Sequence, residues 1–467
     1  MLNPSEQTLI PIDPSIFRAY DIRGVAGQSL TTQTIYLLGQ ALGSLAQEIG
    51  EHSLVVGRDG RLSGPELLRV LSQGVMDTGC NVIDLGCVPT PLLYYGTCIL
   101  KTTSGVMLTG SHNPPEYNGL KMVMGNKTLA ETEIQDLRER IATKQFMSGR
   151  GAYLSLDISN LYISHILNDI KLARPLKIVI DAGHGVAGLT AAQLYRQLGC
   201  MVEELYCDID GNFPDHHPDP SQVGNLSDLM HHVRKSHADV GLAFDGDGDR
   251  LGVVTASGKI IWPDRQLMLF AQDVLQHCPN ATIIYDVKCS RHLAAFIQQH
   301  NGRPLMWKTG HSLIKAKLVE TGAKLAGEMS GHLFFKDRWY GFDDAIYAGA
   351  RLLEILSRTL QSSDDLFNKI PDSVNTPEMK ISVSEHEKFH LMQKLTDCAF
   401  FRDVKEIITI DGLRINFADG WGLVRPSNTS PYLILRFEAE HETILLKIQL
   451  LFREWLLSVK PDLILPF

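Results

Sequence analysis

The chain has 467 residues, about three times the roughly 150 expected of one domain, so several domains are expected. Hydrophobic residues make up 44% and charged residues 21%, which is typical of globular proteins and excludes a disordered chain, a collagen-like fibre and a coiled coil. The net charge of −9 gives no general attraction to nucleic acid or to an anionic membrane, so any phosphate must meet a local basic pocket.

No segment approaches the ~18 apolar residues that a membrane helix needs, and we expect neither a membrane nor a nucleic acid as a partner. The 8 cysteines include no Cys-x-x-Cys pair and are too sparse for a disulfide scaffold. We therefore expect buried thiols in a reducing compartment, and the cytoplasm is the predicted location.

One pattern of elements occurs three times along the chain and indicates three α/β domains. A short apolar strand ends in a turn with an acidic residue, and a helical stretch, a second strand and a third apolar strand follow. The first strands are Leu54 to Asp59, Ile178 to Asp181 and Ile283 to Asp286, and the second strands are Asn81 to Leu85, Met201 to Leu205 and Pro304 to Trp307. In such largely parallel sheets, ligands collect beyond the carboxyl ends of the strands, where each third strand here runs into a polar loop.

The residues after 371 follow a different pattern, and we expect a smaller α+β domain there. Ile407 to Phe417 and Leu433 to Phe437 are predicted strands on either side of the turn Arg425 to Thr429, and Thr443 to Val459 is the predicted closing helix. The Pro-, Asp- and Ser-rich stretch from Ile370 to Pro377 marks the last boundary. The predicted domains are 1–156, 157–259, 260–371 and 372–467.

The first polar loop, Thr109 to Pro115, contains Ser111. A serine in a turn fixed by glycine and proline can be held in one exposed orientation, as a nucleophile or phosphate carrier requires. His112 is adjacent, but adjacent residues seldom hydrogen-bond each other as nucleophile and base, and the Gly-x-Ser-x-Gly pattern is absent. Taken alone, the loop is equally typical of a plain Ser- and Asn-rich turn.

Three further signals are discounted. Gly183 to Gly188 matches Gly-x-Gly-x-x-Gly after a strand, but equivalent turns of the other repeats lack these glycines, so we do not expect a bound nucleotide. His216 and His217 could bind a metal, yet their Pro-rich loop favours a solvated turn. The stretch Met122 to Met124 is most simply part of the core.

The strongest local signal is the run from Asp245 to Arg250, which follows the predicted strand Val240 to Phe244. Side chains two residues apart in an extended loop point the same way, so Asp245, Asp247 and Asp249 can converge on one hard cation. Without a cation, these carboxylates would repel one another. An EF-hand fails on spacing, because its sixth position would be arginine and its twelfth alanine. The run predicts an octahedral Mg²⁺ site left open for a phosphate oxygen.

The polar loops of the last two domains complement each other. Gly327 to His332 presents a carboxylate and a hydroxyl that suit the vicinal hydroxyls of a sugar. Arg425 to Ser430 presents a guanidinium, hydroxyls and exposed amides that suit a phosphate. Lys288 and the stretch Lys308 to His311 add basic groups. Each loop by itself is more often an ordinary turn.

In this order, the motifs closely resemble those of the α-D-phosphohexomutases, on the bacterial phosphomannomutase/phosphoglucomutase branch. The resemblance begins at Phe17 to Gly24, continues through the four loops and covers essentially the whole chain. It implies four domains around a central cleft, with one α/β topology shared by the first three. It also implies a monomer whose partners are small phosphosugars.

The resemblance implies a role for each matching residue. Ser111 looks like the phosphorylated serine, and Asp245, Asp247 and Asp249, with the serine phosphate, look like the Mg²⁺ ligands. The groups near proton transfer would be Arg23, Lys121 and His332. The substrate contacts would be Tyr20, His112, Arg250, Lys288, His311, Glu328, Met329, Ser330, Gly331, Arg425, Ser427, Asn428 and Thr429.

Within this set, Glu328 and Ser330 are similar to the residues that hold sugar O3 and O4, and Arg425 to Thr429 to the site of the phosphate that is not transferred. Pro426 departs from the pattern, where a small residue is expected. Since proline has no N–H, this position lacks one backbone group that could donate to a phosphate.

The implied activity is an intramolecular phosphotransferase that interconverts hexose 1-phosphate and hexose 6-phosphate of mannose and glucose. Phosphoserine would donate to the free hydroxyl, and the bound 1,6-bisphosphate would turn end for end and return its other phosphate, with glucose 1,6-bisphosphate as activator. The alternatives are a phosphoglucosamine mutase, a phosphoserine-type sugar phosphatase and a non-enzymatic sugar-phosphate binder. Met329 resembles the mannose/glucose branch, because the glucosamine branch usually has Gln at this position.

Overall fold

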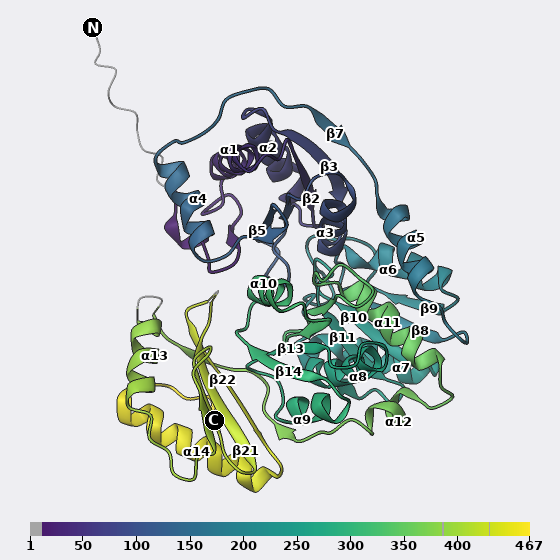
Figure 1. Ribbon diagram of the computed structural model, residues 1–467, viewed down its shortest axis with the longest axis vertical. Coiled ribbons are helices and arrows are strands. Elements are labelled where there is room, and N and C mark those ends of the chain that lie inside the picture. Colours follow the sequence, from purple (N-terminus) through teal and green to yellow (C-terminus); the bar gives the residue numbers. More distant parts are fainter. Residues whose placement is uncertain (1–11, 385–386, 429) are drawn as a thin grey trace. The chain divides into compact units, whose positions relative to one another are not determined.

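The computed structural model describes residues 12–384, 387–428 and 430–467 (Figure 1). The chain forms two compact units. The first unit extends up to Ile260 and includes Phe342–Leu360, and the second consists of Ile261–Gly341 and Gln361–Phe467. The described residues contain four β-sheets.

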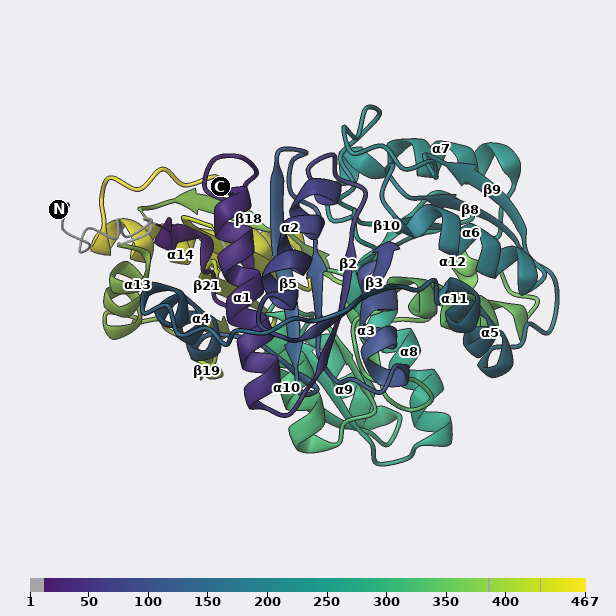
Figure 2. The ribbon, with the colours of Figure 1, turned by 90° about the horizontal axis from the view of Figure 1, so that it is seen from above.

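The first sheet carries the loop with Ser111. Its strand order is β1 (Ile22–Val25), β5 (Tyr117–Met124), β4 (Gly105–Leu108), β2 (Ser53–Arg58), β3 (Asn81–Cys87) and β7 (Tyr153–Ser155), with β6 (Lys127–Thr128) paired to β5. Its helices are η1 (Pro14–Ile16), α1 (Thr32–Glu48), α2 (Gly64–Met76), α3 (Thr90–Ile99) and α4 (Thr132–Ala142). Helices α1 and α2 lie side by side (Figure 2). Met122 and Met124 belong to the core of this domain, as predicted.

The second sheet carries the aspartate loop. Its strand order is β12 (Ile260–Ile261), β11 (Leu251–Thr255), β10 (Val240–Phe244), β8 (Lys177–Asp181) and β9 (Met201–Leu205). Its helices are α5 (Ser159–Asp169), α6 (Ala187–Gln197), η2 (Val223–Leu226) and α7 (Ser227–Ser236). Helix α11 (Ala345–Ser357) comes from much later in the chain, yet the Tyr195 hydroxyl donates to the Ile346 carbonyl, 2.9 Å away, and ties this helix to the first unit.

The third sheet has the strand order β14 (Arg303–Trp307), β13 (Thr282–Asp286), β15 (Leu325–Gly327) and β16 (Leu333–Phe335). Its helices are α8 (Pro263–His277), α9 (His292–Gln299) and α10 (His311–Thr321), and α12 (Ser363–Phe367) belongs to the same unit.

The first three sheets share one topology, which confirms the predicted repeat. Their equivalent strand orders are β3-β2-β4-β5, β9-β8-β10-β11 and β14-β13-β15-β16. In each sheet the first three of these strands are parallel and the fourth is antiparallel, so the sheets are mixed rather than uniformly parallel. The central strand β10 (Val240–Phe244) is buried along its whole length and is accordingly apolar throughout. The domain boundaries at 156, 259 and 371 remain predictions.

The fourth sheet is antiparallel and has two helices, α13 (Lys388–Asp397) and α14 (Glu442–Val459). Its strand order is β17 (Val374–Asn375), β22 (Tyr432–Ala439), β21 (Gly420–Pro426), β20 (Leu413–Asn416) and β19 (Glu406–Ile408), with β18 (Met379–Ser382) also paired to β22. Helix α14 packs along β21 and β22 (Figure 1).

Two predictions about the fourth domain were wrong in detail. The predicted strand from Ile407 to Phe417 is two strands, because Gly412 adopts a left-handed φ of 86° and reverses the chain between them. The predicted turn at Arg425 begins later, since Arg425 and Pro426 still pair with β22 as the last residues of β21. The predicted closing helix is confirmed as α14.

The prediction of buried thiols holds for four of the eight cysteines. Cys80, Cys200, Cys207 and Cys289 are buried, whereas Cys98 and Cys398 are exposed and Cys87 and Cys278 are half-buried, and all eight are free thiols. Among the described residues, no helix is both long and apolar enough to cross a membrane.

Candidate active site

Ser111 lies in the loop after β4 and has an uncommon backbone conformation. Its φ of 49° is in the left-handed region, which costs a non-glycine residue about 1–2 kcal/mol. Its backbone N–H donates to the Thr109 hydroxyl oxygen, 2.7 Å away, and its own hydroxyl donates to Asp245 Oδ2 at 2.9 Å. Only 1% of the residue is exposed. The loop therefore aims the serine hydroxyl at the aspartate cluster of the next domain.

The three predicted metal ligands converge. Asp245, Asp247 and Asp249 are completely buried, and their carboxylates offer ligand atoms that all lie within 4.8 Å of one another. The loop folds back at Gly248, whose φ is 76°, so that the N–H groups of Gly248 and Asp249 each donate to Asp245 Oδ1 at 3.1 Å. A side chain at Gly246 would lie 2.5 Å from the Ser111 carbonyl oxygen, so glycine permits the close approach of the two loops.

Lys121 of β5 neutralises part of this cluster. Its ammonium donates to Asp247 Oδ2 at 2.7 Å and also pairs with Asp249. Thr90 donates its hydroxyl to the same Asp247 oxygen at 2.5 Å. Burial alone would lower the pKa of Lys121, but Asp247 and Asp249 together raise it, so the ammonium stays charged.

The cluster fits a divalent cation. Asp247 Oδ1 is buried and accepts no hydrogen bond within the described part of the chain. Burial, together with the charges of Asp249 and Asp247, raises the pKa of Asp245 well above its ordinary value, which is the expected cost of carboxylates without a metal between them. Three carboxylates with only oxygen donors suit a hard ion, so these residues could hold a metal.

We expect metal affinity to fall as pH falls, because a protonated Asp245 no longer offers a ligand. Since its pKa is raised, the loss begins at a higher pH than for an ordinary aspartate, and metal binding must release a proton near and below that pKa. Calorimetric titration with Mg²⁺ at about pH 6 and about pH 8, in buffers of different ionisation enthalpy, measures both effects. An affinity that does not change with pH, with no proton released, would contradict this expectation.

The other predicted residues of the first unit lie on neighbouring elements. Arg23 of β1 pairs in register with Gly119 of β5, so it shares a face of the sheet with Lys121, two residues further along. Arg23 also pairs with Asp21 at 2.5 Å, and Tyr20 lies just before β1.

His112 and Arg250 belong to the same two loops as Ser111 and the aspartates. The Arg250 Nε lies 3.7 Å from Asp245 Oδ2, and His112 Nδ1 lies 3.5 Å from Asp219 Oδ2. Loss of solvent around the ring, together with the positive charge of Arg250, lowers the pKa of His112 to about 3, so the imidazole is neutral at pH 7.

The predicted sugar loop lies in the second unit, after β15. Glu328 is 2% exposed, and its Oε1 accepts the N–H of Gly310 at 2.6 Å. Burial raises the pKa of Glu328. The rings of His311 and His332 stack with centroids 5.6 Å apart. Around them, Met329 and Ser330 are half-buried and Gly331 is buried.

The predicted phosphate loop is tied to the third domain within the same unit. Arg425 forms a two-point ion pair with Asp411, through Nε at 2.9 Å and Nη2 at 3.2 Å. Asp411 also accepts the Thr309 N–H at 3.0 Å, and the Asn428 amide donates to the Thr309 carbonyl at 3.4 Å. Ser427 is buried. Thr429 lies outside the described residues.

Lys288, another predicted substrate contact, is buried in the second unit. Its ammonium donates to Glu378 Oε1 at 2.5 Å and lies 3.8 Å from Asp286 Oδ2. Burial by itself would lower the pKa of Lys288, but Glu378 and Asp286 raise it. The structure therefore groups the predicted residues in two sets, one in each unit.

Sequence reasoning noted an acidic residue at the end of the first strand of each repeat but assigned it no role. Asp59, Asp181 and Asp286 end the first strand of each repeat and are at most 1% exposed. Asp59 accepts the Thr109 hydroxyl at 2.8 Å, and Asp286 accepts the Thr309 hydroxyl at 3.0 Å. The signal was visible, because an acid ends the first strand in all three repeats.

The histidine pair and the glycine-rich turn have structural explanations. His216 and His217 do not form a solvated turn, because both are half-buried, His216 Nε2 lies 3.1 Å from Asp181 and His217 bonds to the His112 carbonyl. In the turn, a side chain at Gly185 would lie 2.9 Å from the backbone of Gly246. His217 therefore contacts the Ser111 loop, and the glycine-rich turn packs against the aspartate loop.

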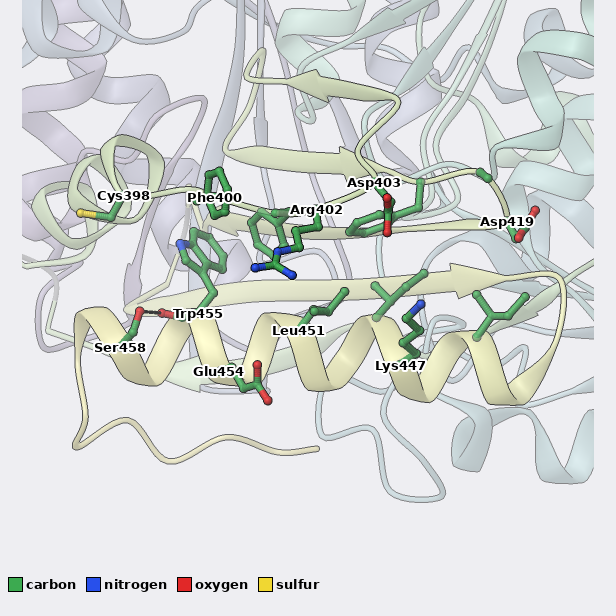
Figure 3. Close-up of a pocket in the computed structure, with 15 residues that line it drawn as sticks. Cys398, Phe400, Arg402, Asp403, Asp419, Lys447, Leu451, Glu454, Trp455 and Ser458 are labelled. Atoms are coloured by element: carbon green, nitrogen blue, oxygen red, sulfur yellow. Dashed lines mark hydrogen bonds between the residues drawn. The ribbon is translucent and has the colours of Figure 1, made fainter.

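A groove lies on the fourth domain, between α14 and the segment from Cys398 to Asp403. It has a volume of about 720 Å³, and Figure 3 shows Lys447, Leu451 and Trp455 pointing into it from α14. Phe400, which is 81% exposed, lines its other side. None of the predicted site residues lines this groove.

Comparison with known proteins shows the family to which the chain belongs. Four family profiles match: phosphoglucomutase/phosphomannomutase alpha/beta/alpha domain I at residues 14–148, domain II at 160–258, domain III at 262–374 and the C-terminal domain at 378–454. The phosphomannomutase/phosphoglucomutase of Pseudomonas aeruginosa strain PAO1 is 56% identical over 453 residues, 97% of this chain and 98% of that protein. The phosphoglucomutase of Neisseria meningitidis serogroup A is 51% identical over 454 residues, 97% of this chain and 98% of that protein.

A solved structure is similar as well. The crystal structure of a phosphoglucomutase/phosphomannomutase family protein from Burkholderia thailandensis has a TM-score of 0.94 and 51% identity, and the match covers 98% of this chain and 100% of that one. The chain therefore belongs to the α-D-phosphohexomutase family.

Proposed function

We propose that this protein interconverts hexose 1-phosphate and hexose 6-phosphate, with mannose and glucose as the sugars, through a phosphorylated Ser111 and a bound 1,6-bisphosphate. The observation that carries the proposal is the position of Ser111. Its backbone has a φ of 49°, and its hydroxyl donates to Asp245 at 2.9 Å. A buried serine aimed at a carboxylate triad is a poor arrangement for stability alone, since like charges are placed together. It is a good arrangement for receiving and giving a phosphoryl group beside a cation.

The first transfer breaks the bond between phosphorus and the Ser111 oxygen and forms a bond between phosphorus and the oxygen of the free sugar hydroxyl. The sugar hydroxyl gives up its proton, and the Ser111 oxygen gains one and becomes a hydroxyl again. The charged ammonium of Lys121 and the guanidinium of Arg23 can offset the negative charge that develops there. Lys121, whose ammonium pairs with Asp247 and Asp249, would lie with Arg23 near the proton transfer. His332 would take part in proton transfer.

Asp245, Asp247 and Asp249, with an oxygen of the serine phosphate, would hold Mg²⁺. Such an ion neutralises charge on the transferring phosphoryl group. Arg250 and His112 lie in the same two loops as the aspartates and Ser111, and they would help to position the ligand.

The residues of the second unit would hold the ligand. Arg425, Ser427, Asn428 and Thr429 would bind the phosphate that is not transferred. Glu328 and Ser330 would accept and donate hydrogen bonds at sugar hydroxyls. The remaining contacts would come from Tyr20, Lys288, His311, Met329 and Gly331.

One phosphate site and one phosphoryl donor suffice if the intermediate turns over. After the turn, Glu328 and Ser330 would bind the same sugar hydroxyls in exchanged positions. The newly transferred phosphate would then occupy the Arg425 site, and the other phosphate would face Ser111. A bisphosphate that escapes leaves Ser111 without phosphate, so glucose 1,6-bisphosphate is the proposed activator. Phosphosugars would be the partners of a cytoplasmic monomer.

Coupled assays with mannose 1-phosphate, glucose 1-phosphate and glucosamine 1-phosphate test the proposed substrates. We expect kcat/KM for the first two to exceed that for the third by at least about tenfold, because Met329 offers no hydrogen bond to an amino group. A preference for glucosamine 1-phosphate would overturn this choice of sugars and favour a phosphoglucosamine mutase.

A further inference from the structure

We infer that Arg61 is a positioning residue for the reaction: it holds the Ser111 loop in the shape that aims the serine, and Asp59 holds Arg61 in turn. The inference rests on the proposed function, since it concerns how Ser111 gains and loses its phosphate. Arg61 follows β2, lies 50 residues before Ser111 and is 1% exposed.

The guanidinium of Arg61 donates to four carbonyls of one short loop. Nη2 donates to the carbonyls of Ser111 at 2.7 Å and Asn113 at 2.6 Å. Nη1 donates to the carbonyls of Pro114 at 2.5 Å and Tyr117 at 2.9 Å. A planar fork with fixed N–H directions can serve several acceptors at once, which the ammonium of lysine cannot do with the same geometry.

The remaining donors and the surroundings of Arg61 are also fixed. Its Nε and its backbone N–H each donate to Asp59 at 3.1 Å, and Asp59 accepts the Gly110 N–H at 3.1 Å. The ring of Phe213 covers the guanidinium with its centroid 5.3 Å away. A side chain at Gly110 would lie 2.3 Å from Arg61 Cζ, so the loop touches the guanidinium directly.

These contacts explain how Ser111 keeps an unfavourable φ of 49°. The loop has turn hydrogen bonds of its own, such as the Asn113 N–H donating to the Gly110 carbonyl at 3.0 Å, and the four bonds from a buried fork add to this constraint. They also set the direction of the amide that follows. Because the peptide between Ser111 and His112 is trans, drawing the carbonyl toward Arg61 turns the His112 N–H the other way, where a phosphate oxygen could accept it.

The test is the rate at which glucose 1,6-bisphosphate phosphorylates Ser111 in a single turnover, followed by quenching and intact-mass measurement. Arg61→Gln should slow this step at least about 100-fold, because small misplacements of a reacting group have effects of that size. The dissociation constant of glucose 1-phosphate should stay within about threefold, since its phosphate and sugar would be held mainly by Arg425 and Glu328 of the second unit, whereas Arg61 holds a loop of the first unit. Arg61→Lys should recover less than about a tenth of the rate, because charge without the fork cannot rebuild four contacts.

Arg351→Gln is the matched control. Arg351 is also 1% exposed in the first unit, but its guanidinium lies beside Tyr347 on α11. It should lower thermal stability while the phosphorylation rate stays within about threefold. If Arg61→Gln does not fold, Gly110→Ala tests the same contact, because the added methyl group would collide with the Arg61 guanidinium and displace the loop. It should slow phosphorylation in the same way, and an unchanged rate would overturn the role of Arg61.

The possible results separate this inference from the proposed function. Phosphorylation at the wild-type rate in Arg61→Gln, or full recovery by Arg61→Lys, would overturn the role of Arg61. Equal slowing in Arg351→Gln would show that loss of any buried arginine has this effect through stability, and it would also overturn the role of Arg61. A wild-type protein that takes no phosphate at Ser111 would instead refute the proposed function.

Discussion

Replacing Ser111 with alanine is expected to remove the phosphorylated form of the protein and to lower the mutase rate by at least ~10³-fold. The hydroxyl is the proposed acceptor and donor of the phosphoryl group, and its position beside Asp245 makes no other group an obvious substitute. Intact-mass measurement before and after incubation with glucose 1,6-bisphosphate gives the first readout, and a coupled assay gives the second.

Ser104→Ala is the control for this change. Ser104 is fully buried just before β4 and accepts the Gly125 N–H at 2.9 Å, so its loss tests the effect of removing a buried hydroxyl in the same domain. It should keep the phosphorylated form. Full activity in Ser111→Ala, or stable phosphate on another serine, would contradict the assignment.

The second large effect is expected for Asp247→Asn. An amide in place of this carboxylate removes a negative ligand and also weakens the hold on Lys121, which bonds to Asp247 at 2.7 Å. We expect Mg²⁺ affinity to fall by at least about tenfold and the rate at saturating metal to fall by about 10²–10³-fold. Calorimetric titration and activity measured against Mg²⁺ concentration separate the two effects.

Asp84→Asn provides the comparison, because Asp84 is a buried carboxylate of the same unit that accepts the Gly86 N–H at 2.7 Å, outside the aspartate cluster. Its Mg²⁺ affinity should stay within about twofold. Activity that survives complete chelation in the wild-type protein would refute the metal requirement.

The sequence predicts best what depends on neighbours along the chain. The spacing of Asp245, Asp247 and Asp249 predicted their convergence, and the structure confirms it, because a loop of alternating glycines after a buried strand can bring them together. The threefold repeat was also predictable, since periodic apolar strands and helices carry the topology.

Contacts between distant residues could not be predicted in this way. Arg61 and Ser111 are 50 residues apart, and Lys121 and Asp249 are 128 apart, so nothing local marks either pair. The packing of α11 on α6 joins residues from predicted third and second domains for the same reason.

Phosphorus NMR of glucose 1-phosphate turnover tests the central claim most directly. With Mg²⁺ and a catalytic amount of glucose 1,6-bisphosphate, we expect the glucose 1-phosphate signal to be replaced by glucose 6-phosphate, with the bisphosphate not consumed and no inorganic phosphate released. Accumulation of inorganic phosphate in place of glucose 6-phosphate would show a phosphatase and contradict the account.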